Sequence, residues 1–283
     1  MRKLGGWALG LLLVTGLAWG EGGKPGDVRK QIESSLLVKG AIDINADGSV
    51  AAHTLERESE LPVGIVAMIG KAVPQWRFEP IKLKEGTQRA RANMSIRIVA
   101  RKLDDGNFAV DIRGAQFGQE QPDTQTVRSK DRLTPPRYPE KAAYAGVGGS
   151  VYLVLKVGRD GQVIDAVAEQ VNLRVVTNGY AMTRWRDMLA KSAMAAAMKW
   201  TFTPPTEGEE VAAPYWSVRV PVDFIAPGQA EPKDYAWTTY VPGPRQLIPW
   251  RTEISGAGAD ALVAGGVYPL DSGLQLKTPL GGS

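Results

Sequence analysis

The sequence predicts an α+β protein of two tandem units, each a small antiparallel sheet packed on one or two helices, followed by an irregular tail rich in Pro and Gly. Three observations support this prediction. Short runs of alternating apolar and polar residues are typical of half-buried strands. In each half of the chain an Asp-Gly turn separates two such runs, and an amphipathic helical stripe follows. These features recur in the same order in both halves, which indicates an internal duplication.

Residues 1–20 have the features of a secretory signal. Arg2 and Lys3 precede an uncharged run, and Ala18-Trp19-Gly20 forms a small-x-small cleavage step before Glu21. An uncleaved anchor is the alternative, because the apolar run approaches the roughly 20 residues of a membrane span. We therefore expect a periplasmic protein, with inner-membrane anchoring as the alternative location. The chain has no Cys, which excludes lipid attachment through a cysteine.

The amino-acid composition varies along the chain and divides the part after the predicted signal into four segments. We expect a first unit over residues 21–117, a polar linker over 118–134, a second unit over 135–225 and the irregular tail over 226–283. The linker contains almost no large apolar residue, and the tail shows no sustained periodicity. The formal charge of the whole chain is +4, which is too small to indicate nucleic-acid binding.

The second unit shows its elements most clearly. Alternating residues over 151–157 predict a strand, residues 158–161 a turn, and residues 162–170 the return strand of a hairpin. A helix is expected over 183–198, because Leu189, Ala193 and Trp200 belong to one stripe of apolar residues at helical spacing. A final strand is expected over 215–224.

The first unit repeats this order. Asp47-Gly48 precedes Asp160-Gly161 by 113 residues, and the Trp-x-Phe-x-Pro motif at 76–80 precedes its counterpart at 200–204 by 124 residues. The aromatic residues of both motifs are expected to pack helix against sheet. Pro74 ends the first helix early, and an additional strand is expected over 108–116 after a turn at 104–107.

Few residues are suited to catalysis or metal binding. His53 is the only histidine, and with no Cys the chain cannot build a metal site from several imidazoles or thiolates. A strand position for His53 is favoured over a catalytic role. Asp43 and Asp47 fit a hairpin turn better than a calcium loop, because the remaining oxygen ligands of such a loop are missing. We predict no enzymatic activity, no catalytic residue, no metal and no cofactor.

The second unit resembles the TonB C-terminal domain. The resemblance rests on Pro136-Arg137-Tyr138-Pro139, on Trp200 to Pro204, and on the strand from Val218 to Phe224, and it covers residues 135–225. The first unit resembles the family only from its hairpin onward. Domains of this family capture an extended segment of an outer-membrane transporter, which adds as a strand to an open sheet edge.

This resemblance implies a partner-binding strand at 215–224 and an envelope protein as partner, such as an outer-membrane transporter or its periplasmic segment. The candidate residues of this strand are Tyr215, Ser217, Val218, Arg219, Val220, Val222 and Phe224. Alternatively, the tail, the first unit or a second chain already covers the strand. Pro214 and Pro221 would limit uncontrolled pairing at such an edge.

Three functions follow as hypotheses. The favoured one is a periplasmic binding or adaptor protein that engages its partner by strand addition. The second is a membrane-anchored energy transducer of the TonB type, although no long Pro-rich spacer follows the signal. The third is a self-assembling structural protein of the envelope, which would form homo-oligomers.

Overall fold

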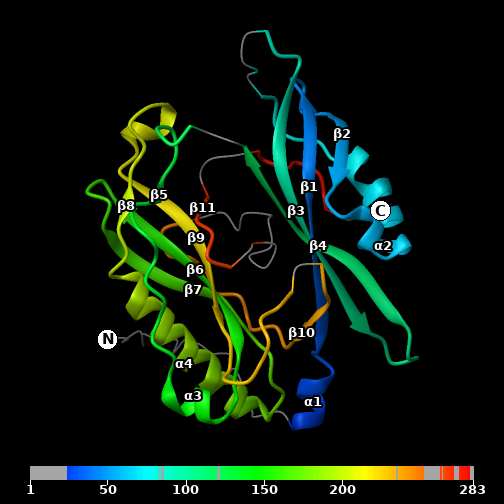
Figure 1. Ribbon diagram of the computed structural model, residues 1–283, viewed down its shortest axis with the longest axis vertical. Helices are drawn as coiled ribbons and strands as arrows, with labels where there is room; N and C mark the ends of the chain where they lie inside the picture. The colour runs from blue at the N-terminus through cyan, green and yellow to red at the C-terminus, as the bar shows by residue number, and fades with distance from the viewer. Residues whose placement is uncertain are drawn as a thin grey trace, which may run out of the picture.

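The computed structural model describes residues 24–81, 83, 86–119, 122–233, 235–251, 262, 264–270 and 274–280. The predicted signal over 1–20 lies outside these residues. Within the described part of the chain, no helix is long and apolar enough to cross a membrane. The fold is α+β: two antiparallel sheets face each other, and segments of the tail run between them (Figure 1).

The first unit and the tail strand β10 (Thr238–Tyr240) form a five-stranded sheet in the order β10-β1-β3-β4, with β2 also paired to β1. Helix α2 (Val63–Ala72) covers one face of this sheet, where Leu36, Ile96 and Ile98 are buried with Ile69 of the helix. The elements are α1 (Pro25–Arg29), β1 (Glu33–Asn45), β2 (Val50–Leu55), η1 (Glu58–Glu60), α2 (Val63–Ala72), η2 (Val73–Gln75), β3 (Arg89–Lys102) and β4 (Phe108–Gln119).

The second unit and the tail strand β11 (Tyr268–Pro269) form a four-stranded sheet in the order β11-β9-β6-β7, and β5 pairs with β8 in a small separate sheet. Its long helix packs Leu189, Ala193 and Ala197 into a core with the apolar faces of β6 and β9. The elements are β5 (Arg128–Ser129), α3 (Glu140–Tyr144), β6 (Gly149–Gly158), β7 (Val163–Leu173), α4 (Gly179–Ala197), β8 (Phe202–Thr203), η3 (Glu209–Ala212) and β9 (Tyr215–Phe224).

The turn glycines of the two units have the same surroundings. Gly48 and Gly161 have positive φ angles of 84° and 79°. A Cβ atom at either position would lie 2.1 Å from a carbonyl oxygen, that of Phe78 in the first unit and that of Phe202 in the second. Each glycine therefore allows its hairpin turn to pack directly against the Trp-x-Phe segment.

The aromatic residues of both Trp-x-Phe-x-Pro motifs are buried, as the sequence predicts. Trp76 and Phe78 are each 1% exposed, whereas Trp200 and Phe202 are 4% and 3% exposed. Each indole also donates a hydrogen bond to a backbone carbonyl outside its own motif, Trp76 to Leu280 and Trp200 to Thr134. The motif therefore fastens the end of each helix to neighbouring chain segments.

Strands β4, β6 and β7 differ from their predicted bounds by one to three residues, and two further differences have a structural cause. Helix α4 begins four residues before the predicted start at 183, because the Asn178 side chain accepts a hydrogen bond of 2.9 Å from the Ala181 amide and caps the helix there. Within the predicted linker, Arg128 and Ser129 form β5, which pairs with β8, and Val127 is buried in the second core.

The tail connects the two sheets. It adds β10 (Thr238–Tyr240) to β1, and Val241 then exchanges two backbone hydrogen bonds with Leu173 at the end of β7. Further along, β11 (Tyr268–Pro269) pairs with β9. Residues 274–280 return to the first unit, where Leu276 forms a bridge with Phe78. The tail thus forms strand pairs with both units although it has little regular structure of its own.

Candidate partner-binding edge

The candidate strand β9 is an outer strand of the three long strands of the second unit, beside β6. It pairs with β6 along its whole length, from Tyr215 opposite Gly158 to Phe224 opposite Gly149. Six of the seven candidate residues are buried, namely Ser217, Val218, Arg219, Val220, Val222 and Phe224, and Tyr215 is half-buried. Side chains of this strand are therefore largely removed from solvent, and a partner would have to recognise its backbone.

The side chains of β9 alternate between two environments. Val218, Val220, Val222 and Phe224 point into the core beneath α4. Tyr215, Ser217 and Arg219 belong to the other face of the strand, because successive residues of a strand point to opposite sides. The first set holds the strand in the core, which Val241 of the tail also joins, and the second set lies on the opposite face of the strand.

The outer edge of β9 already carries an added strand. Tyr268 of β11 lies opposite Arg219, and Pro269 lies opposite Val218. On either side of this pair, the Leu270 amide donates to the Ser217 carbonyl at 2.9 Å and the Gly265 amide donates to the Pro221 carbonyl at 3.0 Å. The tail therefore uses the backbone groups of β9 from Ser217 to Pro221 that a strand from another protein would use.

A buried ion cluster lies on the tail-facing side of β9. Arg219 donates two hydrogen bonds to Glu169, from Nε to Oε2 at 2.7 Å and from Nη2 to Oε1 at 3.1 Å. Arg245 of the tail adds a bond from Nε to Oε1 at 2.9 Å. The side chains of Arg219 and Glu169 are only 3% and 4% exposed, whereas that of Arg245 is 34% exposed. One carboxylate thus holds both β9 and the tail.

A bulge in β7 explains why Glu169 reaches this cluster. Gln170 pairs with Tyr152 and Ala168 pairs with Leu153, so Glu169 is the extra residue between them. Such a bulge changes the direction of a side chain relative to the regular alternation. Burial lowers the pKa of the Arg219 guanidinium below its ordinary value, and the negative charge of Glu169 opposes this shift.

Aromatic residues extend the contact between the tail and the sheet. The Lys156 ammonium lies 4.2 Å from the ring centroid of Tyr215 and 6.0 Å from that of Trp250, within the range of cation–π interactions. The Tyr215 hydroxyl donates to the Trp250 carbonyl at 3.1 Å. The tail therefore covers this face of β9 with side chains as well as its edge with backbone.

The other residues considered from the sequence are in structural positions. His53 is half-buried in β2 and pairs with Ile42 of β1. Asp47 accepts hydrogen bonds from the amide and the hydroxyl of Ser49, which lower the pKa of this exposed carboxyl. In the part of the chain that the structure describes, no group of three or more His, Asp and Glu side chains could hold a metal ion.

Sequence reasoning did not identify Glu169 or Arg245 as parts of this site, and it named the tail only as one of three possible covers of the strand, without locating β11. Glu169 depends on a bulge, which a single sequence does not reveal. The polar residues at 215, 217, 219 and 223 did carry a signal, because polar residues at every second position of a strand indicate a second, differently covered face.

Part of the chain is similar to known proteins. Over 96 residues it is 38% identical to proteins named "Protein TonB" from two strains of Xanthomonas campestris pv. campestris. The match covers 34% of this chain and 37% of each relative, so the chain spans little more than a third of the length of the curated relatives that it matches. No protein-family model and no solved structure matches the chain. The similarity over this third of the chain supports a relationship to the TonB family.

Proposed function

We propose that this chain is a non-enzymatic envelope protein of the periplasm, built from two TonB-like units, that binds an extended segment of a partner protein by strand addition to β9. One observation carries the proposal: the outer edge of β9 accepts an added antiparallel strand, here its own β11. Strand addition relies on main-chain hydrogen bonds and tolerates many sequences. The partner class, an outer-membrane transporter or its periplasmic segment, comes from the resemblance to TonB.

A partner strand would replace β11. The described part of this strand is short and held weakly, because Tyr268, Pro269 and Leu270 are only half-buried. Each of the two hydrogen bonds beside the pair, from Leu270 and from Gly265, contributes about 0.5–1.5 kcal/mol net. A partner that pairs with β9 beyond 217–221 gains further bonds at either end, which favours the exchange.

The substitution Leu270→Pro tests the proposal, because proline lacks the amide that donates to Ser217. We expect the amide of Arg219 to exchange hydrogen faster in this variant. Binding of synthetic peptides from the periplasmic segments of outer-membrane transporters should tighten by about twofold to tenfold, the equivalent of one hydrogen bond. Leu247→Pro is the matched control, since Leu247 is an exposed tail residue that lies outside β11.

The outcomes separate the hypotheses. Faster exchange together with tighter peptide binding supports partner capture at β9. Faster exchange with no binding of any such peptide, by wild type or variant, contradicts capture and favours a structural role for β11. N-terminal sequencing of the mature protein distinguishes a periplasmic form that starts at Glu21 from an anchored transducer that keeps residues 1–20.

A further inference from the structure

A second interaction surface is the outer edge of β4, which lies in the first sheet. The strand order places β4 at one end of that sheet, and in the part of the chain that the structure describes it pairs with β3 alone. The β3–β4 hairpin projects away from the second unit, toward the lower right of Figure 1. One row of β4 backbone groups therefore has no strand partner among the described residues, whereas β11 already occupies the edge of β9.

The outward-facing backbone groups of β4 follow from the geometry of the hairpin. The Leu103 amide donates to the Asn107 carbonyl at 2.7 Å, so these residues form a hydrogen-bonded pair. Hydrogen-bonded and non-hydrogen-bonded pairs alternate along an antiparallel ladder, which directs the backbone groups of Ala109 and Asp111 toward β3. The remaining residues of this segment direct their amide and carbonyl groups outward, namely Phe108, Val110 and Ile112.

This segment lacks the usual protection of a sheet edge. Natural edge strands are often short or carry lysine or proline, but β4 has 12 residues and contains neither. Phe108 and Val110 are 62% and 37% exposed, and they share a face with Ile112, which is buried in the core. A bulge at Arg113 bends the strand and ends the regular segment. The apolar face of the sheet thus continues past the core to the exposed end of the hairpin.

We propose that two copies of this chain associate through this segment of β4, in antiparallel pairing about a two-fold axis at Val110. A two-fold axis requires the paired edge to be complementary to itself. With the axis at Val110, Phe108 of each copy lies opposite Ile112 of the other, and the two Val110 side chains meet. Every outward-facing residue then belongs to a pair that exchanges two backbone hydrogen bonds. The inference does not depend on strand addition at β9, which lies in the other sheet.

The charged residues are compatible with this register. Arg113 bonds to Glu33 through Nη2 and remains 42% exposed, and it would lie opposite Asn107 of the other copy. The Asn107 side chain donates to the carboxylate of Asp105 at 2.9 Å, so the guanidinium would approach an acidic turn. Moving the axis by one residue, to Asp111, would place two carboxylates opposite each other, which is unfavourable. The charges therefore favour the axis at Val110 over this neighbouring register.

Sedimentation equilibrium of the mature protein at about 1 to 500 μM tests the association. We expect a weak dimer with a dissociation constant of roughly 10–100 μM, because the paired segment is short. Val110→Lys places two like charges at the axis and should weaken the dimer at least about tenfold. Ile164→Lys is the matched control, since Ile164 is a 56% exposed strand residue of β7, and its dimer should be as stable as that of the wild type.

Single cysteines test the register, because the chain contains no Cys. In Val110→Cys the two thiols meet at the axis, so oxidation by copper phenanthroline should give a disulfide-linked dimer. Phe108→Cys is the control: residue 108 lies opposite residue 112 of the other copy, so its two thiols would be about 13 Å apart along the strands. A disulfide does not span that distance.

A wild-type protein that stays monomeric at every concentration would overturn the proposal, and so would a dimer that Val110→Lys leaves unchanged. Equally efficient cross-linking of Val110→Cys and Phe108→Cys would overturn the register. Circular dichroism checks the folding of each variant, and the cross-linking result stands by itself if Val110→Lys does not fold. Leu270→Pro should leave the dimer unchanged, because β11 lies in the other sheet, so this test is separate from that of partner capture at β9.

Discussion

The ion cluster beneath the tail gives the sharpest stability prediction. Glu169→Gln keeps the shape of the side chain but replaces a carboxylate oxygen with an amide NH2 group. Glu169 accepts three hydrogen bonds from two guanidinium groups, at 2.7, 3.1 and 2.9 Å. After the substitution an NH2 group faces guanidinium donors, and the buried Arg219 loses the carboxylate that accepts two of its hydrogen bonds.

The magnitude follows from burial. Removing one partner of a buried ion pair costs about 3–5 kcal/mol, and the 3% exposure of Arg219 places this pair in that class. The bond from Arg245 adds at most about 1 kcal/mol, because that side chain is 34% exposed. For a protein of this size each kcal/mol lowers the unfolding temperature by roughly 2–4 °C, so a total of about 3–6 kcal/mol gives an expected decrease of about 6–24 °C.

Urea and thermal unfolding followed by circular dichroism measure this effect. Glu140→Gln is the matched control, because Glu140 and Arg137 are separated by the same 2.7 Å but are 71% and 86% exposed. The control should change the free energy of unfolding by at most about 1 kcal/mol. If Glu169→Gln and Glu140→Gln had the same small effect, the argument from burial would be wrong.

Three further predictions concern single residues. Gly161→Ala should lower the free energy of unfolding by more than about 1 kcal/mol, because φ of Gly161 is positive and the added Cβ would meet the Phe202 carbonyl oxygen. Gly70→Ala in α2 should raise it slightly, and equal urea unfolding midpoints of the two variants would contradict this prediction. Asn178→Ala should lower the free energy of unfolding by about 1 kcal/mol, because it removes the side-chain cap of α4. Asn178→Ser should lower it much less, and urea unfolding of the two variants measures this difference. An NMR titration should place the pKa of the Asp47 carboxyl below its ordinary value of 3.8, because the Ser49 hydroxyl and amide donate hydrogen bonds to the carboxylate. The small stabilisation by the ionised carboxylate is therefore present above pH 3.8 and is lost as the pH falls through the lowered pKa, and an unchanged titration midpoint in Ser49→Ala would refute this cause.

Local patterns predicted much of the fold. The strand at 215–224 has the predicted bounds, because alternation over ten residues and the preceding proline define both of its ends. The extra strand of the first unit begins at the predicted residue, Phe108, where an Asp-Asp-Gly-Asn turn leaves little choice of register. These elements are determined by residues close together in sequence, and periodicity reports such interactions well.

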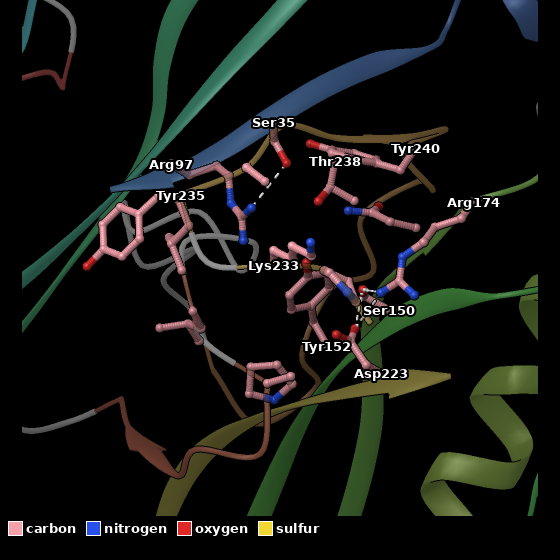
Figure 2. Close-up of a pocket in the computed structure, with 17 residues that line it drawn as sticks. Ser35, Arg97, Ser150, Tyr152, Arg174, Asp223, Lys233, Tyr235, Thr238 and Tyr240 are labelled. Atoms are coloured by element: carbon pink, nitrogen blue, oxygen red, sulfur yellow. Dashed lines mark hydrogen bonds and ion pairs between the residues drawn. The ribbon is translucent and has the colours of Figure 1, made fainter. Parts of the chain in front are cut away.

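Pairing between distant segments could not be predicted in the same way. β10 joins β1 across about 200 residues, and Thr238 to Tyr240 show no distinctive pattern. Arg97, Arg174 and Lys233 likewise line one pocket between the two sheets (Figure 2), and only the tertiary fold brings them together. A single sequence records which face of a strand is apolar, but it does not record which other strand or side chain covers the opposite face.

The tail changes how the edge of β9 is understood. The sequence predicts that Pro214 and Pro221 limit uncontrolled pairing at this sheet edge. In the structure, however, the Pro221 carbonyl accepts a bond from Gly265, so this proline coexists with an added strand. Pro221 lacks only the amide, and its carbonyl still accepts a hydrogen bond. Pro221 therefore limits strand pairing at this edge without preventing it. The tail strand β11 pairs beside Pro221, at Val218 and Arg219, although it contains a proline itself, Pro269. A partner strand pairs well here if none of its carbonyl groups needs a hydrogen bond from residue 221, because Pro221 has no amide to donate. Candidate peptides can be ranked by this criterion before their binding is measured.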